Sequence, residues 1–498
     1  MRQSRREATS TWSTLFFKSS SCPVANSDCP DCSRLLEIFD APISQKAVVL
    51  LLGRGTEEEA ESGGKQAIEF ASCCERLRSL ISGTFFHFDE MLVHRVPDVV
   101  AVKQKSRHTF ILASWSWYSA SLELSAETPI ASHGTAITLN PDWIEGGILQ
   151  KWKRRCDSAL WADVTLVSKA DSSARVQPET WCLVAGSSQD IYVALSYVWG
   201  QRPFFKTLKN NLEQLRAPMA LHSDRGALLP ETIWDAISVV QTMGERYLWV
   251  DALCIIQDDE VQTKREINNM ASIFANATVT IVAAGGANAY SGLLGLRGIS
   301  PRRNLHQKIF QLHTGHKIVQ RRYQRGGRRP KPLWYERGWT LQEHIFSRRR
   351  IIFENEGVRW ECDRSLWHED INTTETADLG HRELNQLLNS LPRPEQSDVE
   401  SYREMISSPI PQLHHLNALI TRYSNMKLTY PEDILRAFQG ITSVLSQSFA
   451  GGFAAGLPIV FFDAAILWYT SPSTLGSRRS SHPNSLSGSL IPSWSWAG

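Results

Sequence analysis

Three side chains between positions 251 and 266 carry groups that could do chemistry. Asp251 lies in the apolar run 247–256, where an ionised carboxylate is costly unless it is hydrogen-bonded or ion-paired. Cys254 follows near the carboxyl end of the strand that this run predicts, and open α/β sheets place ligands at that edge. Glu266 is expected in the first turn of the next helix. Two carboxyls and a thiol in this region are therefore candidates for a ligand-binding or catalytic site.

Each of these residues also has a structural interpretation, and the sequence leaves both interpretations open. Asp251 suits the capping of a neighbouring helix, and Cys254 suits a small core position. Glu266 completes a capping box with Thr263, which would account for a glutamate there without any catalytic role.

The sequence contains none of the common nucleotide-binding, hydrolase or metal-site motifs. Gly53-Arg54-Gly55 is followed by Glu58 where a dinucleotide fingerprint needs glycine, and there is no phosphate loop, G-x-S-x-G or H-E-x-x-H. Cys29-Pro-Asp-Cys32 has no second ligand pair at zinc-site spacing. We therefore expect no metal and no bound cofactor.

The elements that must position these residues follow from apolar periodicity. A strand at 191–199, a short helix near 206–216 and a helix opened by Leu229-Pro-Glu-Thr232 precede the strand 247–256. A helix from the capping box and a strand at 278–284 follow. This β-(α)-α-β-α-β order predicts a three-layer α/β sandwich with a mainly parallel sheet.

Sequence on either side of this block is less regular. Residues 299–335 contain ten Lys or Arg and no acid, which favours a solvated basic loop, and 337–343 begin a helix. A hairpin is expected across 354–357, and 453–469 reads as a buried helix. We divide the chain into a disordered or loosely attached N-terminus (1–34), a region of unknown fold (35–185), the α/β domain (190–362), a polar, loop-rich linker (363–410) and a mostly helical C-terminal region (411–498).

Composition argues against a nucleic-acid-binding, secreted or membrane-spanning protein. The 498 residues carry a net charge of +2, so no overall field attracts nucleic acid or an acidic membrane. Nine scattered cysteines favour reduced thiols, and the N-terminus has no apolar secretory core. No stretch is long and uncharged enough to predict a membrane span, so we expect a cytoplasmic protein. The 17 tryptophans favour a tryptophan-anchored core or a partner surface.

A series of short blocks runs in order along the chain: Tyr192-Val-Ala-Leu-Ser-Tyr-Val-Trp-Gly200, Leu229-Pro-Glu-Thr-Ile233, Tyr247-Leu-Trp-Val-Asp-Ala-Leu-Cys-Ile-Ile-Gln257, Glu266-Ile267, Ile273-Phe274, Arg337-Gly-Trp-Thr-Leu-Gln-Glu343, Leu428-Thr-Tyr-Pro-Glu-Asp433 and Pro492-Ser-Trp-Ser-Trp496. These blocks resemble the fungal heterokaryon incompatibility (HET) domain and the region that usually follows it. Trp152 and Cys156 keep only part of a W-x-C-x-x-H-x-x-C-like pattern seen in many relatives. The chain ends two residues after the last block, where relatives continue, so we expect a shortened C-terminus.

The resemblance implies an effector of programmed cell death in fungal non-self recognition, acting through self-association or a protein partner. HET domains are remotely similar to TIR domains and so to flavodoxin-like folds, and some TIR domains cleave NAD. An alternative is therefore an NAD glycohydrolase with NAD as substrate and Glu266, then Asp251, as candidate catalytic residues. A second alternative, which the net charge of only +2 disfavours, is nucleic-acid binding by the basic stretch 302–331. Binding or assembly candidates within the matching blocks are Trp199, Gly200, Cys254, Trp339 and Glu343.

Overall fold

The computed structural model places the core of the α/β domain, most of the C-terminal region and isolated strands of the N-terminal region. The expectations for residues 1–34 and for most of the polar linker lie outside the described residues. The structure describes residues 48–51, 66–69, 99–106, 109–113, 119–125, 135–158, 174–222, 229–311, 317–322, 332–355, 357–362, 365–372, 401–406, 408, 410–467, 491–492 and 494–497.

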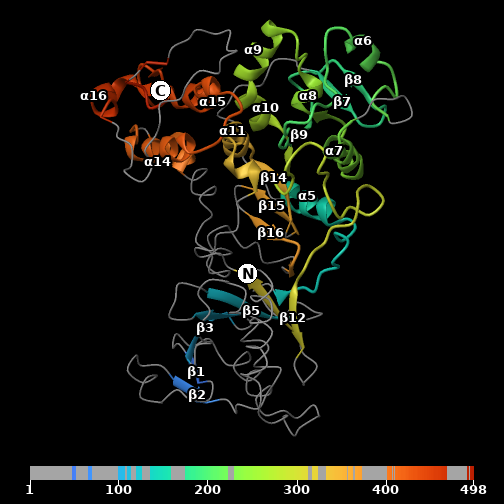
Figure 1. The fold of residues 1–498 in the computed structure, drawn as a ribbon, viewed down its shortest axis with the longest axis vertical. Helices are drawn as coiled ribbons and strands as arrows, with labels where there is room; N and C mark the ends of the chain where they lie inside the picture. The colour runs from blue at the N-terminus through green and yellow to red at the C-terminus, as the bar shows by residue number, and fades with distance from the viewer. Residues whose placement is uncertain are drawn as a thin grey trace, which may run out of the picture.

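An eight-stranded sheet forms the centre of the α/β domain, in the order β16-β15-β14-β11-β9-β10-β7-β8 (Figure 1). The four central strands are parallel neighbours, whereas the pairs at both edges are antiparallel. The sheet is therefore mixed, with a parallel centre, and the expectation of a mainly parallel sheet was too broad. The strands are β7 (Arg175–Gln177), β8 (Cys182–Val184), β9 (Val193–Ser196), β10 (Leu248–Trp249), β11 (Val279–Ala283), β14 (Arg349–Glu354), β15 (Gly357–Cys362) and β16 (Leu366–His368).

Helices cover this sheet, and every residue of β9 and β11 is buried. In Figure 1 helices α5 and α7 lie on one side of the central strands, and α10 and α11 lie on the other. The predicted helix after Pro230 is confirmed as α7, which ends before Gly244, a residue with φ of +75°. The helices are α5 (Ile148–Ser158), α6 (Leu212–Leu215), α7 (Glu231–Thr242), α8 (Asp251–Cys254), α9 (Glu260–Asn268), α10 (Met270–Asn276), the 3₁₀ turn η2 (Leu333–Glu336) and α11 (Gly338–Phe346).

The strand order reverses direction at β9. The chain leaves β9 for β10 on one side, then crosses to β11 on the other side and continues outward to β14. Val193 of β9 pairs with Leu248 of β10 and with Val279 of β11. In open α/β sheets the loops that leave such a reversal diverge, which opens a ligand crevice at the carboxyl ends of the strands.

Two local expectations were wrong. The apolar run 247–256 is not one strand, because β10 ends at Trp249 and helix α8 starts at Asp251. An apolar run this short fits a buried helical turn as well as a buried strand, so its composition alone cannot separate the two.

The capping box was also misplaced. Helix α9 begins earlier, at Glu260, where the side chain of Asp259 accepts hydrogen bonds from the backbone N–H groups of Val261 and Gln262. Glu266 consequently lies in the last turn of α9, not in the first turn of a helix, and its side chain is buried.

A second sheet combines strands from the N-terminal region with strands from the basic stretch 299–335. Strand β13 pairs antiparallel with β5 along its whole length, so two strands stand where we expected a basic loop. Its strands are β1 (Val48–Leu51), β2 (Gln66–Glu69), β3 (Val99–Ser106), β4 (Thr109–Ala113), β5 (Ser119–Ser125), β6 (Thr135–Ala136), β12 (Lys308–Gln311), β13 (Lys317–Arg322) and β17 (Ile371–Asn372).

The C-terminal region contains helices α14 and α15, but over the described residues 453–467 a hairpin, a 3₁₀ turn and the short helix α16 stand where one continuous helix was expected. Gly456 has φ of +86° and the next strand contains Pro458, so a hairpin replaces the start of that helix. Within the described ranges, no helix is both long and apolar enough to cross a bilayer. The elements are α14 (Leu413–Ser424), η3 (Pro431–Ile434), α15 (Arg436–Leu445), β18 (Phe453–Ala454), β19 (Leu457–Pro458), η4 (Ile459–Phe461) and α16 (Phe462–Ala465).

Candidate functional site

Asp251 and Trp199 meet at the carboxyl edge of the parallel strands, beside the reversal at β9. The indole Nε1 of Trp199 donates a hydrogen bond to Asp251 Oδ2 at 2.8 Å, and the backbone N–H of Ala252 donates to Oδ1 at 2.7 Å. Asp251 and Trp199 are half-buried, while the adjacent Gly200 is exposed. Residue Asp251 is therefore only partly shielded from solvent, although its carboxyl group is buried enough for its pKa to rise.

Gly200 gives the chain the turn that this contact needs. Its φ is +77°, and a Cβ at this position would lie 2.4 Å from the Cβ of Asn288. Asn288 belongs to the loop after β11, and the backbone N–H of Ala289 donates to the carbonyl of Trp199 at 3.2 Å. Only glycine lets the loops after β9 and β11 pack this closely.

Glu343 joins the same edge from helix α11. The hydroxyl of Ser196, the last residue of β9, donates a hydrogen bond to Glu343 Oε2. Ser196 in turn accepts a hydrogen bond from Trp334 Nε1 at 2.8 Å. A relay of buried polar side chains therefore fixes this second carboxyl next to the end of β9.

Both carboxyls hold their protons more tightly than usual. Burial raises the pKa of Asp251 to about 6, against the lowering effect of hydrogen bonds from Ala252, Trp199 and Tyr197. Burial also raises the pKa of Glu343 to about 7, the hydrogen bond from Ser196 opposes this, and the negative charge of Asp251 adds to the rise. A pair of interacting carboxyls that titrates near neutral pH can donate and accept protons under physiological conditions.

A lysine and two aromatic rings flank the half-buried carboxyl. The ammonium of Lys206 lies over the Trp199 ring, 4.1 Å from its centroid, and Phe204 packs edge-on against the same ring. Burial lowers the pKa of Lys206, and the charge of Asp251 counteracts that effect. The loop 199–206 therefore places a cation next to the candidate acid.

The other predicted site residues lie elsewhere. Cys254 is buried in α8, where the backbone N–H of Val250 donates to its sulfur, and burial raises the pKa of its thiol to about 12. Glu266 is buried and interacts electrostatically with Cys254 and with Tyr192, which precedes β9. Trp339 of α11 is half-buried against the main core. The structure thus gathers Trp199, Gly200, Asp251 and Glu343 at one edge, while Cys254 lies behind them in the core, within electrostatic reach of both Asp251 and Glu266.

Four participants were not among the predicted residues: Ser196, Tyr197, Lys206 and Trp334. Ser196 and Tyr197 follow the apolar part of the predicted strand 191–199, and polar groups at the end of a buried parallel strand are a usable signal for a site. Lys206 and Trp334 come from a loop and a 3₁₀ turn, and no spacing in the sequence connects them to Asp251.

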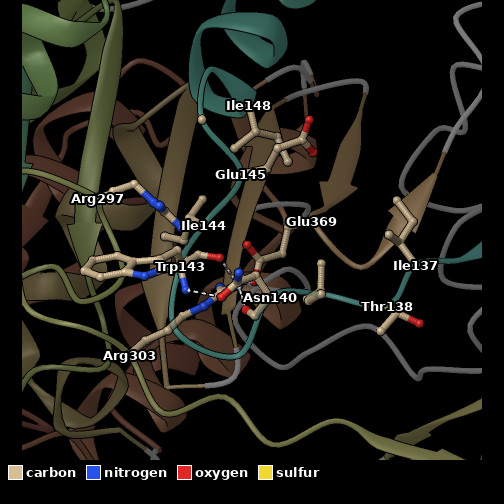
Figure 2. Close-up of a pocket in the computed structure, with 12 residues that line it drawn as sticks. Ile137, Thr138, Asn140, Trp143, Ile144, Glu145, Ile148, Arg297, Arg303 and Glu369 are labelled. Carbon is tan, nitrogen blue, oxygen red and sulfur yellow. Dashed lines mark hydrogen bonds and ion pairs between the residues drawn. The ribbon is translucent and has the colours of Figure 1, made fainter.

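A separate cavity of about 420 Å³ lies where residues 137–148 meet the loop before β12 (Figure 2). Its buried polar wall is an ion pair between Arg303 and Glu369, and Arg303 also donates to the carbonyls of Asn140 and Trp143 at 2.8 and 2.9 Å. Burial raises the pKa of Glu369 to about 7 despite this pairing. Arg303 is one of the ten basic residues of the stretch 299–335, and its side chain is buried in the protein instead of facing solvent.

Neither the edge with Asp251 and Glu343 nor the cavity beside Arg303 and Glu369 has the ligands of a metal site. Among the described residues, no three His, Cys, Asp or Glu side chains come together in a way that could hold a metal ion. The edge formed by Ser196, Trp199, Asp251 and Glu343 is therefore the better candidate for function, because it holds two interacting carboxyls whose pKa values burial raises to about 6 and about 7.

Comparison with known proteins identifies the segment that carries this edge. Neither the curated proteins nor the solved structures give a match. Residues 192–343, however, match the family described as heterokaryon incompatibility protein (HET). The matched range starts one residue before β9 and ends at Glu343, so it contains Trp199, Gly200, Asp251 and Glu343. The chain therefore contains a HET-family segment over residues 192–343.

Proposed function

We propose that this protein is an intracellular effector of fungal non-self recognition, whose HET domain triggers programmed cell death through self-association or a protein partner. The observation that carries the proposal is the family match over residues 192–343. The carboxyl edge of β9 lies inside that range and is held by hydrogen bonds between side chains, as expected of a site that must keep one geometry.

The test is inducible expression of the full chain in a filamentous fungus, with viability as the readout. We expect growth arrest with the parent chain and loss of toxicity in Trp199→Phe and Glu343→Gln. Trp199→Phe removes the indole donor to Asp251 and keeps an aromatic ring. The matched control is Glu260→Gln, an exposed glutamate in the first turn of α9, which should stay toxic. Normal growth with abundant, folded parent protein would exclude the effector role.

A second candidate function is cleavage of NAD at the bond between nicotinamide and ribose. The observation that favours it is the pair Asp251 and Glu343. The fold brings both carboxyls to one edge of the sheet, and burial raises their pKa values to about 6 and about 7. Nicotinamide leaves as a neutral molecule, so the reaction needs a carboxylate to stabilise the oxocarbenium-like ribosyl group and a base to deprotonate the attacking water. The two carboxyls supply one group for each task.

Purified protein incubated with NAD tests this activity, with free nicotinamide measured by chromatography. We expect release by the parent and a loss of at least tenfold in Asp251→Asn and in Glu343→Gln. Glu266→Gln distinguishes the two possible sites, because Glu266 lies in the last turn of α9, apart from the cluster. Loss in Glu266→Gln alone would move the chemistry to that residue, and no release by folded parent protein at high concentration would exclude NAD cleavage.

A further inference from the structure

Two buried thiols from distant parts of the chain contact each other. Cys156 lies in the last turn of α5 and Cys362 is the last residue of β15, and their side chains are hydrogen-bonded. Each residue is 1% exposed. The contact joins a helix that precedes the matched HET range to a strand that follows it.

We propose that Cys156 and Cys362 form an intramolecular disulfide when the protein meets a hydroperoxide. In the first step the thiolate of Cys156 attacks the peroxide O–O bond, which gives a sulfenic acid and an alcohol, or water when the oxidant is hydrogen peroxide. In the second step the Cys362 sulfur attacks the sulfenic sulfur, the S–S bond forms and water leaves. The two thiols lose two protons and two electrons, and the peroxide gains both.

The position of Cys156 gives the oxidant a route. The following residues Asp157 and Ser158 are exposed, and the last turn of a helix opens more readily than its middle. Arg349 pairs across the strands with Cys362 and donates a hydrogen bond to Asp157 at 3.0 Å, so it ties the end of α5 to the end of β15. In the closed fold the hydrogen bond with Cys362 and burial raise the pKa of the Cys156 thiol, and the positive charge of Arg349 opposes them. Opening of this turn removes the burial that disfavours the thiolate and leaves Cys156 near a cation that favours it.

The other described thiols have different neighbours. Cys182 contacts the hydroxyl of Thr180 at 3.1 Å, and Cys254 contacts backbone groups of Leu248 and Val250. A disulfide requires a second sulfur at close range, so oxidation is expected to link Cys156 and leave Cys182 as a thiol.

The test oxidises the full native chain with hydrogen peroxide, blocks remaining thiols under denaturing conditions and maps tryptic peptides without reduction. Trypsin releases Cys156 in the peptide 156–169 and Cys362 in the peptide 360–364. We expect a linked species 2 Da lighter than the sum of the two peptides, its disappearance on reduction, and a fully blocked Cys182. Its absence after prolonged oxidation, with both peptides recovered blocked, would overturn the proposal.

A matched pair of variants checks the assignment. Cys362→Ser removes the resolving sulfur, so Cys156 should be recovered as an oxidised acid or a blocked thiol and never in the linked species. Cys182→Ser leaves the pair intact, so the yield of the linked species should not change. A Cys156 cross-link to any other cysteine in the parent chain would also overturn the proposal.

Discussion

Glu343→Gln should make the folded protein more stable at alkaline pH and leave its stability nearly unchanged in acid. The substitution keeps the shape of the side chain and an amide oxygen that can accept the hydrogen bond from Ser196. It removes the negative charge that burial disfavours in this position. The effect is therefore expected to depend on pH, which a change in packing alone would not do.

The magnitude follows from the pKa of Glu343, which is about 7 in the folded protein against 4.5 for an unperturbed glutamate. Since the folded state holds the proton more tightly, the contribution of Glu343 to stability is complete below pH 4.5 and is lost as the pH rises through 7. A shift of this size corresponds to about 3 kcal/mol. The free energy of unfolding of Glu343→Gln, relative to the parent, should therefore rise by about 3 kcal/mol between pH 4.5 and pH 8.

The assay is denaturant unfolding of both proteins at pH 4.5, 6 and 8, followed by tryptophan fluorescence. Glu260→Gln is the control for replacing an exposed glutamate and should give a difference that does not change with pH. Because the charge of Asp251 adds to the shift of Glu343, Asp251→Asn should reduce the pH dependence of the effect. A difference between Glu343→Gln and the parent that is constant from pH 4.5 to pH 8 would refute the reasoning.

Three further predictions concern the same domain. Gly200→Ala should lower the free energy of unfolding by roughly 2 kcal/mol, because φ at this position is positive and the new Cβ would collide with Asn288. Thermal unfolding measures this loss, and an unchanged stability would contradict the geometry. Glu361→Ala should cost about 3–5 kcal/mol at pH 8, since it leaves the buried guanidinium of Arg350 without its carboxylate and removes one of the two carboxylates of Arg359, the other being Glu354. A cost below about 1 kcal/mol in denaturant unfolding would contradict this expectation. Trp199→Phe removes a hydrogen bond that lowers the pKa of Asp251, so this variant should lose more stability than the parent between pH 5 and pH 8, and equal losses would exclude that role.

Apolar periodicity was enough to predict several elements of the domain. Helix α7, strand β11 and the β14–β15 hairpin stand where the pattern placed them, because each combines a regular apolar face with a local stop or turn signal. The start of α9 was missed because the Thr263-x-x-Glu266 spacing fits a cap equally well, while Asp259 is the residue that caps the helix. Local signals cannot decide between two adjacent caps when both satisfy the same hydrogen-bonding rule.

The candidate site was predictable only in part, for a related reason. Asp251 attracted attention because a carboxyl in an apolar run needs a partner, but that partner, the Trp199 indole, is 52 positions away. Glu343 reaches the same edge only because β9 lies at the centre of the sheet and α11 packs beside its end. The hydrogen bond that fixes it there comes from Ser196, 147 positions earlier in the sequence. Such pairings depend on strand order, which a single sequence does not determine.

The pairing of β13 with β5 has a consequence for any attempt to isolate the HET segment. A fragment cut to residues 192–343 would carry β12 and β13 without their neighbour β5, and it would also lack β7, β8, β14 and β15 of the central sheet. Its unpaired backbone donors and acceptors would be free to recruit other chains. Aggregation of such a fragment would therefore reflect severed strand ladders and would say nothing about the assembly of the intact protein.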